Sequence, residues 1–124
     1  MRLYTKDHTW VLAEGTRARV GISDFAQKEL GDIAYVELPP IGGSVRRGDV
    51  ACTVDSLKSS SEIYAPVSGA IVEVNSLLSS EENCGMINRE PLDGGWLVLI
   101  EMNDLRELDL LLSEEEYSSY ISGG

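Results

Sequence analysis

The fold is decided by residues Val54–Gly69, which read VDSLKSSSEIYAPVSG, because two strand-like runs meet there at a single lysine. Apolar residues alternate with other residues on both sides, so each run offers one apolar face. The apolar positions are Val50, Cys52 and Val54 before the lysine and Ile63, Ala65 and Val67 after it. The short polar connection predicts a hairpin with Lys58 near its tip, exposed to solvent and flanked by small serines. A lysine meant for modification would be placed there.

Length and composition predict one domain, residues 1–124, with a hydrophobic core. The chain has 124 residues, of which 43% are hydrophobic, so it is neither disordered nor fibrous. No apolar run approaches the length of a membrane span, so no membrane partner is expected. The formal net charge of -11 argues against nucleic-acid binding, which needs clustered Lys and Arg, and favours protein partners with basic or charge-selective surfaces.

The residues available for catalysis are few. The chain has one histidine and no Gly-x-Ser-x-Gly elbow, Walker loop, dinucleotide-binding glycine pattern or His/Cys metal spacing. His8, beside Trp10, is more often a hydrogen-bonded structural side chain than a base. Cys52 and Cys84 are interpreted as reduced thiols in a cytosol-like compartment. We therefore predict no catalytic residue and no metal ligand.

The first third of the chain predicts two strands followed by a short helix. Leu3 to Leu12 reads as one strand that enters a hairpin at Glu14-Gly15, and residues 17–22 alternate as a second, half-buried strand. Ser23 follows as a helix N-cap, and Gly31 closes about two helical turns as the C-terminal cap.

Strand patterns return after this helix, and helical patterns end the chain. Residues 33–38 and 96–102 read as strands, whereas residues 75–93 lack periodicity and predict a loop-dominated excursion. A C-terminal helical segment is expected over about residues 104–121, with leucines at helical spacing and then a capping box that begins at Ser113. The fold class is therefore mainly β with short helices.

A lysine that tethers a cofactor needs only an exposed amine, a tight turn to present it and a surface that a modifying enzyme can recognise. Acylation removes the charge of the lysine and creates a long swinging arm, which raises the effective concentration of its reactive end at each partner. Spacing alone does not exclude that Lys58 is a plain surface lysine.

Several other blocks of sequence follow one another in an order that is typical of one family. They are YTKDHTW (residues 4–10), GISDFAQKELGD (21–32), VELP (36–39) and NREPLDGGW (88–96). With the lysine stretch, they make the chain resemble, almost end to end, the H protein of the glycine cleavage system. The family fold is a barrel-sandwich hybrid of the lipoyl/biotinyl type, with two small antiparallel sheets, a short helix between early strands and C-terminal helices.

The resemblance implies a carrier that is not itself an enzyme. It makes Lys58 the residue that bears covalently attached lipoate, as lipoyl-lysine. In the family the arm collects an aminomethyl group from a glycine decarboxylase (P protein) and presents it to an aminomethyltransferase (T protein). It is then reoxidised by dihydrolipoyl dehydrogenase (L protein). A lipoate-attaching enzyme is a further implied partner, and the carrier is expected to be a monomer.

Departures from the family pattern surround the expected site. The family has glutamate before Ser-Val-Lys, where this chain has Asp55 and then Ser-Leu-Lys, which bears on recognition by the attaching enzyme. His8 is usually followed by a glutamate that helps to hold the loaded arm in a surface cleft, and Thr9 stands there instead. A hydroxyl supplies no charge, so Glu62 becomes the main carboxylate at a matching position. We expect the loaded arm to be less protected than is usual in the family.

A further departure is the segment 79–85, which is longer than in the family and lacks its usual proline; a tolerated loop insertion explains it better than a contact for one partner. A second function stays open, in which an H-like carrier relays lipoate to other complexes or serves signalling. Biotin attachment is disfavoured, because biotinyl relatives flank their lysine with methionines, whereas Leu57 and Ser59 flank Lys58. The resemblance implies a cytoplasmic location for a bacterial chain and the mitochondrial matrix for a trimmed eukaryotic one.

Overall fold

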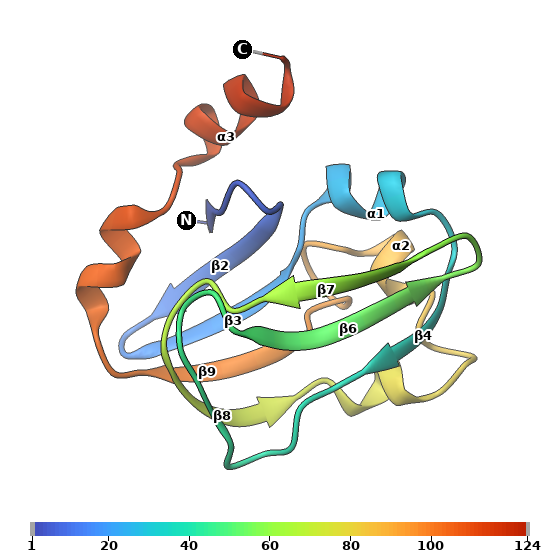
Figure 1. Ribbon diagram of the computed structural model, residues 1–124, viewed down its shortest axis with the longest axis horizontal. Helices are drawn as coiled ribbons and strands as arrows, with labels where there is room; N and C mark the ends of the chain where they lie inside the picture. Colours follow the sequence, from blue (N-terminus) through green and yellow to red (C-terminus); the bar gives the residue numbers. More distant parts are fainter. Residues whose placement is uncertain (1, 124) are drawn as a thin grey trace.

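Two antiparallel sheets make up most of the molecule, as a computed structural model of residues 2–123 shows (Figure 1). The larger sheet has six strands in the order β1-β2-β3-β9-β8-β5, and the smaller has three in the order β4-β6-β7. The strands are β1 (Arg2–Tyr4), β2 (Thr9–Glu14), β3 (Arg17–Ile22), β4 (Ile33–Glu37), β5 (Ser44–Val45), β6 (Val50–Ser56), β7 (Ser60–Tyr64), β8 (Gly69–Val74) and β9 (Val98–Met102). The expected fold class, a mainly β barrel-sandwich hybrid, is confirmed.

Short helices connect and flank the sheets. They are the α-helices α1 (Asp24–Leu30), α2 (Met86–Arg89) and α3 (Glu114–Ile121) and the 3-10 helices η1 (Ser76–Ser79) and η2 (Leu105–Leu110). Helix α1 begins where the Ser23 side chain accepts a hydrogen bond from the backbone N–H of Ala26, and it ends at Gly31, as predicted. None of the helices within residues 2–123 combines the length and apolar character that crossing a bilayer requires.

The main hydrophobic core is formed by residues from both sheets. The side chains that are almost completely inaccessible in it include Val11, Val20, Val54, Ile71, Leu97, Val98 and Ile100. Each such side chain stabilises the fold by about 1.5–3 kcal/mol relative to an exposed position. A smaller cluster around Tyr4, Trp10 and Tyr117 packs helix α3 against β1 and β2.

The C-terminal helical segment agrees with its sequence pattern in its second half and differs in its first. Helix α3 begins with a complete capping box, in which the Ser113 hydroxyl accepts from the Glu116 N–H and the Glu116 carboxylate accepts from the Ser113 N–H. The leucine-rich stretch before it forms the 3-10 helix η2 rather than an α-helix.

Three predictions about strands were wrong in detail. The expected single strand Leu3 to Leu12 is two strands, because a turn at residues 5–8 reverses the chain between β1 and β2. Val50 is 44% exposed rather than part of the inner face, since the pairing of β6 with β7 shifts register between Val50 and Cys52. Strand β7 ends at Tyr64, so Ala65 is buried in irregular backbone.

Candidate functional site

The hairpin between β6 and β7 presents Lys58 at its tip. The Ser56 N–H donates to the Ser59 carbonyl over 2.8 Å, which closes a tight connection. The Ser56 hydroxyl oxygen accepts from the N–H groups of Lys58 (3.3 Å) and Ser59 (3.1 Å), so one small side chain organises the turn. Lys58 is exposed, and the preceding Leu57 is 78% exposed. The structure thus places the predicted acceptor lysine where an enzyme can reach it.

The stem of Lys58 lies across the end of helix α1. Gly31 has φ +82°, and a Cβ added there would come within 3.3 Å of the Lys58 Cε and 3.8 Å of its Nζ. Only glycine adopts this backbone conformation without strain, and the lysine stem lies in contact with it. The ammonium group also lies near the negative end of the helix dipole, an attraction that acylation would remove.

Glu62 and Tyr64 point outward from β7, on the way from the lysine to the far end of the strand. Both side chains are exposed, and the Tyr64 hydroxyl donates to a Glu62 carboxylate oxygen over 3.5 Å. At about 3.3 Å per residue, β7 covers about 13 Å between Ser60 and Tyr64. The outer face of this strand therefore joins the lysine turn to the surface around Tyr64.

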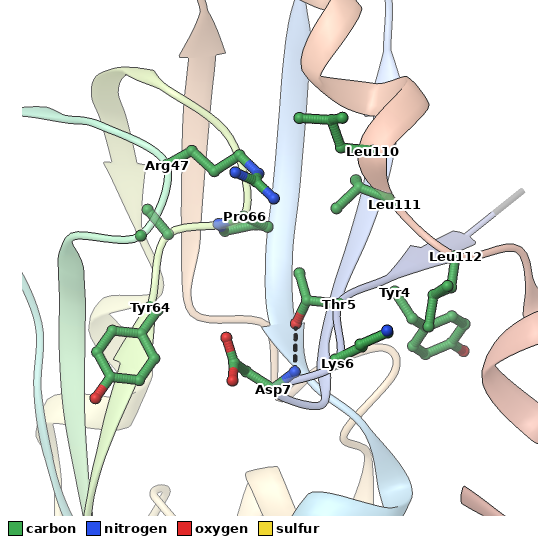
Figure 2. Close-up of a pocket in the computed structure, with 12 residues that line it drawn as sticks. Tyr4, Thr5, Lys6, Asp7, Arg47, Tyr64, Pro66, Leu110, Leu111 and Leu112 are labelled. Atoms are coloured by element: carbon green, nitrogen blue, oxygen red, sulfur yellow. Dashed lines mark hydrogen bonds between the residues drawn. The ribbon is translucent and has the colours of Figure 1, made fainter. Parts of the chain in front are cut away.

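A surface pocket of about 400 Å³ opens beside Tyr64 (Figure 2). It is lined by Tyr4, Thr5, Lys6, Asp7, Arg47, Gly48, Tyr64, Ala65, Pro66, Leu110, Leu111 and Leu112. Figure 2 shows the Asp7 carboxylate directed from the turn between β1 and β2 toward the Tyr64 side of the pocket. The pocket thus combines one carboxylate, two cations and an apolar wall, a set that can hold a small polar group at the end of an apolar chain.

His8 is hydrogen-bonded and packed against aromatic side chains. It is half-buried, it has φ +70°, and its Nδ1 lies 2.8 Å from the hydroxyl of Tyr117, which lies 2.6 Å from the hydroxyl of Ser23. Burial lowers the pKa of His8 below its ordinary value of 6.5, against the smaller opposing effects of Asp7 and Glu29. The imidazole therefore joins the turn before β2 to α3.

Thr9 and Glu62 lie differently from what a shared cleft would require. Thr9 is 1% exposed at the start of β2, so its hydroxyl lies below the surface and not on the rim of the pocket. Glu62 is exposed but does not line the pocket; it approaches it through Tyr64. His8 and Thr9 do not line the pocket and follow Asp7 directly in the chain; their part in holding the arm stays a prediction.

Sequence reasoning missed Asp7 and Tyr64 as pocket residues. Asp7 belongs to the YTKDHTW block, but the family pattern assigns a role to the two residues that follow it, His8 and Thr9. Nothing in the spacing of the chain indicates that a turn before β2 and the end of β7 meet, so only the fold reveals the pair.

The two cysteines take no part in this surface. Cys52 and Cys84 are free and buried, in agreement with the prediction of reduced thiols. Burial raises the pKa of the Cys52 thiol to about 12, so it carries no thiolate near neutral pH and is unreactive.

A family model, curated proteins and a solved structure all assign this chain to the same family. The family described as glycine cleavage H-protein matches residues 2–123. Among curated proteins, the glycine cleavage system H protein of Geobacillus kaustophilus is 46% identical over 121 residues, covering 98% of this chain and 94% of the relative. That of Xanthobacter autotrophicus is 48% identical over 118 residues, covering 95% and 93%.

A solved structure shows the same architecture. The crystal structure of a glycine cleavage system H protein from Mycobacterium marinum superposes with a TM-score of 0.86 at 36% sequence identity. The match covers 98% of this chain and 96% of the other.

Proposed function

Because the chain belongs to the glycine cleavage H-protein family, which carries lipoyl groups, we propose that Lys58 is the residue that bears this group. The observation that carries the proposal is the exposed amine on a tight turn, with its stem lying over a glycine. An attaching enzyme would join the activated carboxyl carbon of lipoate to the Lys58 Nζ; the activating group leaves, and the nitrogen loses its protons and its charge on becoming an amide. The residues present fit such a group, since the turn is small, polar and open.

The family places the chain in glycine cleavage as a lipoyl shuttle. When attached, the lipoyl group supplies a disulfide that can be reduced and can accept a one-carbon amine. The chain itself binds and orients: Ser56 shapes the turn, and Glu62 and Tyr64 provide a polar track along β7. No residue within the described part of the chain is assigned a catalytic role, and the chemistry belongs to the partners.

We also propose that the pocket beside Tyr64 receives the loaded end. Asp7 offers a carboxylate to a cationic amine there, and the leucines of η2 and its C-terminal flank offer an apolar wall. Glu62 adds a second carboxylate along the approach. In this arrangement Asp7, rather than Thr9, supplies the carboxylate nearest to the cargo.

The proposed partners are glycine decarboxylase, the aminomethyltransferase, dihydrolipoyl dehydrogenase and a lipoate-attaching enzyme. Their surfaces would meet a strongly acidic carrier, whose net charge of -11 favours basic docking faces.

Intact mass with peptide mapping tests the proposal. Protein from its own source is expected to carry one lipoyl increment on the peptide that contains Lys58, and a Lys58→Arg variant is expected to carry none. Loaded protein should then support exchange of the glycine carboxyl group with bicarbonate in the presence of glycine decarboxylase. An unmodified Lys58 in cells whose other lipoyl proteins are modified would contradict the attachment; attachment without exchange would favour lipoate relay.

A further inference from the structure

The lysine turn is supported by one peptide unit outside its own hairpin, the unit that joins Asp32 to Ile33. The carbonyl of Asp32 accepts a hydrogen bond from the Leu57 N–H over 3.0 Å. The N–H of Ile33, at the other end of the same unit, donates to the Asn88 side-chain oxygen over 2.9 Å. Because a peptide unit is planar and stiff, a contact that orients its N–H also orients its C=O.

The Asn88 side chain makes two further hydrogen bonds, both to the end of helix α1 that precedes Asp32. Its amide nitrogen donates to the Gly31 carbonyl over 2.8 Å and to the Gln27 side-chain oxygen over 3.0 Å. Gln27 is buried in α1 and donates in turn to Asp24 over 2.9 Å. The carboxamide therefore uses both donors and its acceptor, which defines one orientation and ties α2 to the end of α1.

The lysine depends on this segment through both its backbone and its side chain. Leu57, the residue before it, is tied to Asp32, and the Lys58 stem lies over Gly31. Within the turn, the remaining fixed contacts come from Ser56 and Ser59, and both residues of its tip are exposed. A turn so exposed needs support from outside to stay in one place.

We propose that Asn88 is a positioning residue for the modification of Lys58. It does not touch the lysine; it fixes the Gly31–Ile33 segment against which the turn and the lysine stem lie. An attaching enzyme must bring an activated carboxyl group to within bonding distance of one amine, so movement of the turn lowers the rate. The inference rests on the proposed attachment at Lys58 and adds to it a determinant in a distant part of the sequence.

The test compares Asn88→Asp with Asn75→Asp. Both changes replace an amide that donates to two acceptors by a carboxylate; Asn75 donates to the carbonyls of Gly94 and Trp96, each over 2.9 Å. The apoprotein is treated with a purified lipoate–protein ligase, lipoate and ATP, and modification is followed by mass. The ligase kcat/KM is expected to fall about tenfold for Asn88→Asp and to stay unchanged for Asn75→Asp.

Two further measurements separate positioning from general damage. Acetylation of Lys58 by a small activated ester is expected to proceed equally in all three proteins, because it requires only exposure. Hydrogen exchange should show the Leu57 amide protected in the wild-type protein and about tenfold less protected in Asn88→Asp. The carboxylate can still accept from the Ile33 N–H, but it no longer donates to the Gly31 carbonyl and repels it, which displaces the Gly31–Ile33 segment that carries the acceptor of the Leu57 amide.

The outcomes separate the inference from the function on which it rests. Failure of the ligase to modify the wild-type protein would overturn the attachment itself. Wild-type modification with equal rates in both variants, or equal slowing in both, would overturn the role of Asn88. Should Asn88→Asp not fold, hydrogen exchange in the wild-type protein decides alone. An unprotected Leu57 amide would show that the Asp32 carbonyl does not hold the turn, and this would overturn the inference. We call this support of the turn, from Asn88 through the Asp32–Ile33 peptide unit, the brace.

Discussion

Two nearby residues of the turn before β2 have opposite surroundings. Thr9 is 1% exposed, whereas Asp7, two positions earlier, is exposed and lines the pocket beside Tyr64. The difference arises in the turn at residues 5–8, where His8 adopts φ +70° and reverses the chain before β2. Because Thr9 is buried and Asp7 lines the pocket, Asp7 is the residue to test for an effect on how firmly the loaded arm is held.

Asp7→Asn is expected to shorten the lifetime of the aminomethyl cargo on the carrier several-fold, because a neutral amide attracts a cationic amine less than a carboxylate does. The measurement is the rate of spontaneous loss from loaded protein at low ionic strength. Asp109→Asn, an exposed change of equal charge outside the pocket, is the control. Equal rates of loss in the two variants would exclude Asp7 from the pocket's function.

At the scale of elements, helix α3 is fastened to the start of the chain by a small polar and aromatic network. Tyr117 stacks on Tyr4 with ring centroids 4.3 Å apart. The Tyr117 hydroxyl lies between the hydroxyl of Ser23 and the imidazole of His8, within hydrogen-bond distance of both. Phe25 packs against His8 at 4.7 Å between ring centroids. The network thus joins β1, the N-cap of α1 and α3.

This network makes stability depend on pH. Burial lowers the pKa of His8 in the folded state, so the unfolded chain binds a proton more readily. The contribution of neutral His8 is fully present above about pH 6.5 and is lost as pH falls through this value toward the lower folded pKa. Urea unfolding at pH 7.5 and 5.5 is expected to show lower stability at pH 5.5, with a smaller difference in His8→Gln. Equal differences in both proteins would assign the effect to other groups.

Local signals in the sequence predicted the capped helices α1 and α3 well, and the strand irregularities and the short helices η1 and α2 poorly. Ser23 with Gly31, and Ser113 with Glu116, are caps whose chemistry acts within one helix, so the sequence alone reveals them. The bulge near Val50 depends on how β6 pairs with β7, which no short stretch of sequence specifies.

At the scale of the whole molecule, close packing within the larger sheet sets the tolerance to change. A Cβ at Gly69 would lie 2.0 Å from the backbone carbonyl oxygen of Glu101, in the neighbouring strand β9. Backbone cannot move aside as a flexible side chain can, so the close approach of β8 to β9 at residue 69 requires glycine.

Gly69→Ala is expected to lower the free energy of unfolding by about 3 kcal/mol or to prevent folding. Gly43→Ala is the matched control, because its added Cβ would lie 3.4 Å from the Pro40 carbonyl oxygen, an ordinary contact. Chemical denaturation of both variants checks the difference. A Gly69→Ala protein as stable as Gly43→Ala would show that the two strands can separate at little cost.

The candidate site divides in the same way between local and distant determinants. Lys58 and its serines are neighbours in sequence, so the hairpin and its exposed lysine could be predicted. The brace through Asn88 and the pocket between Asp7 and Tyr64 join segments far apart in the chain. Contacts of this kind follow from topology and are not encoded in local spacing.

The strand order β4-β6-β7 leaves β7 as the outer strand of its sheet over the residues that the structure describes. The unpaired backbone N–H and C=O groups of an edge strand can pair with the same strand of a second copy, which is a common route to aggregation. Glu62 stands at the centre of this five-residue strand, so antiparallel pairing of two copies about their middles would set two carboxylates opposite each other. The Glu62 carboxylate therefore opposes the pairing of two copies of the protein along this edge.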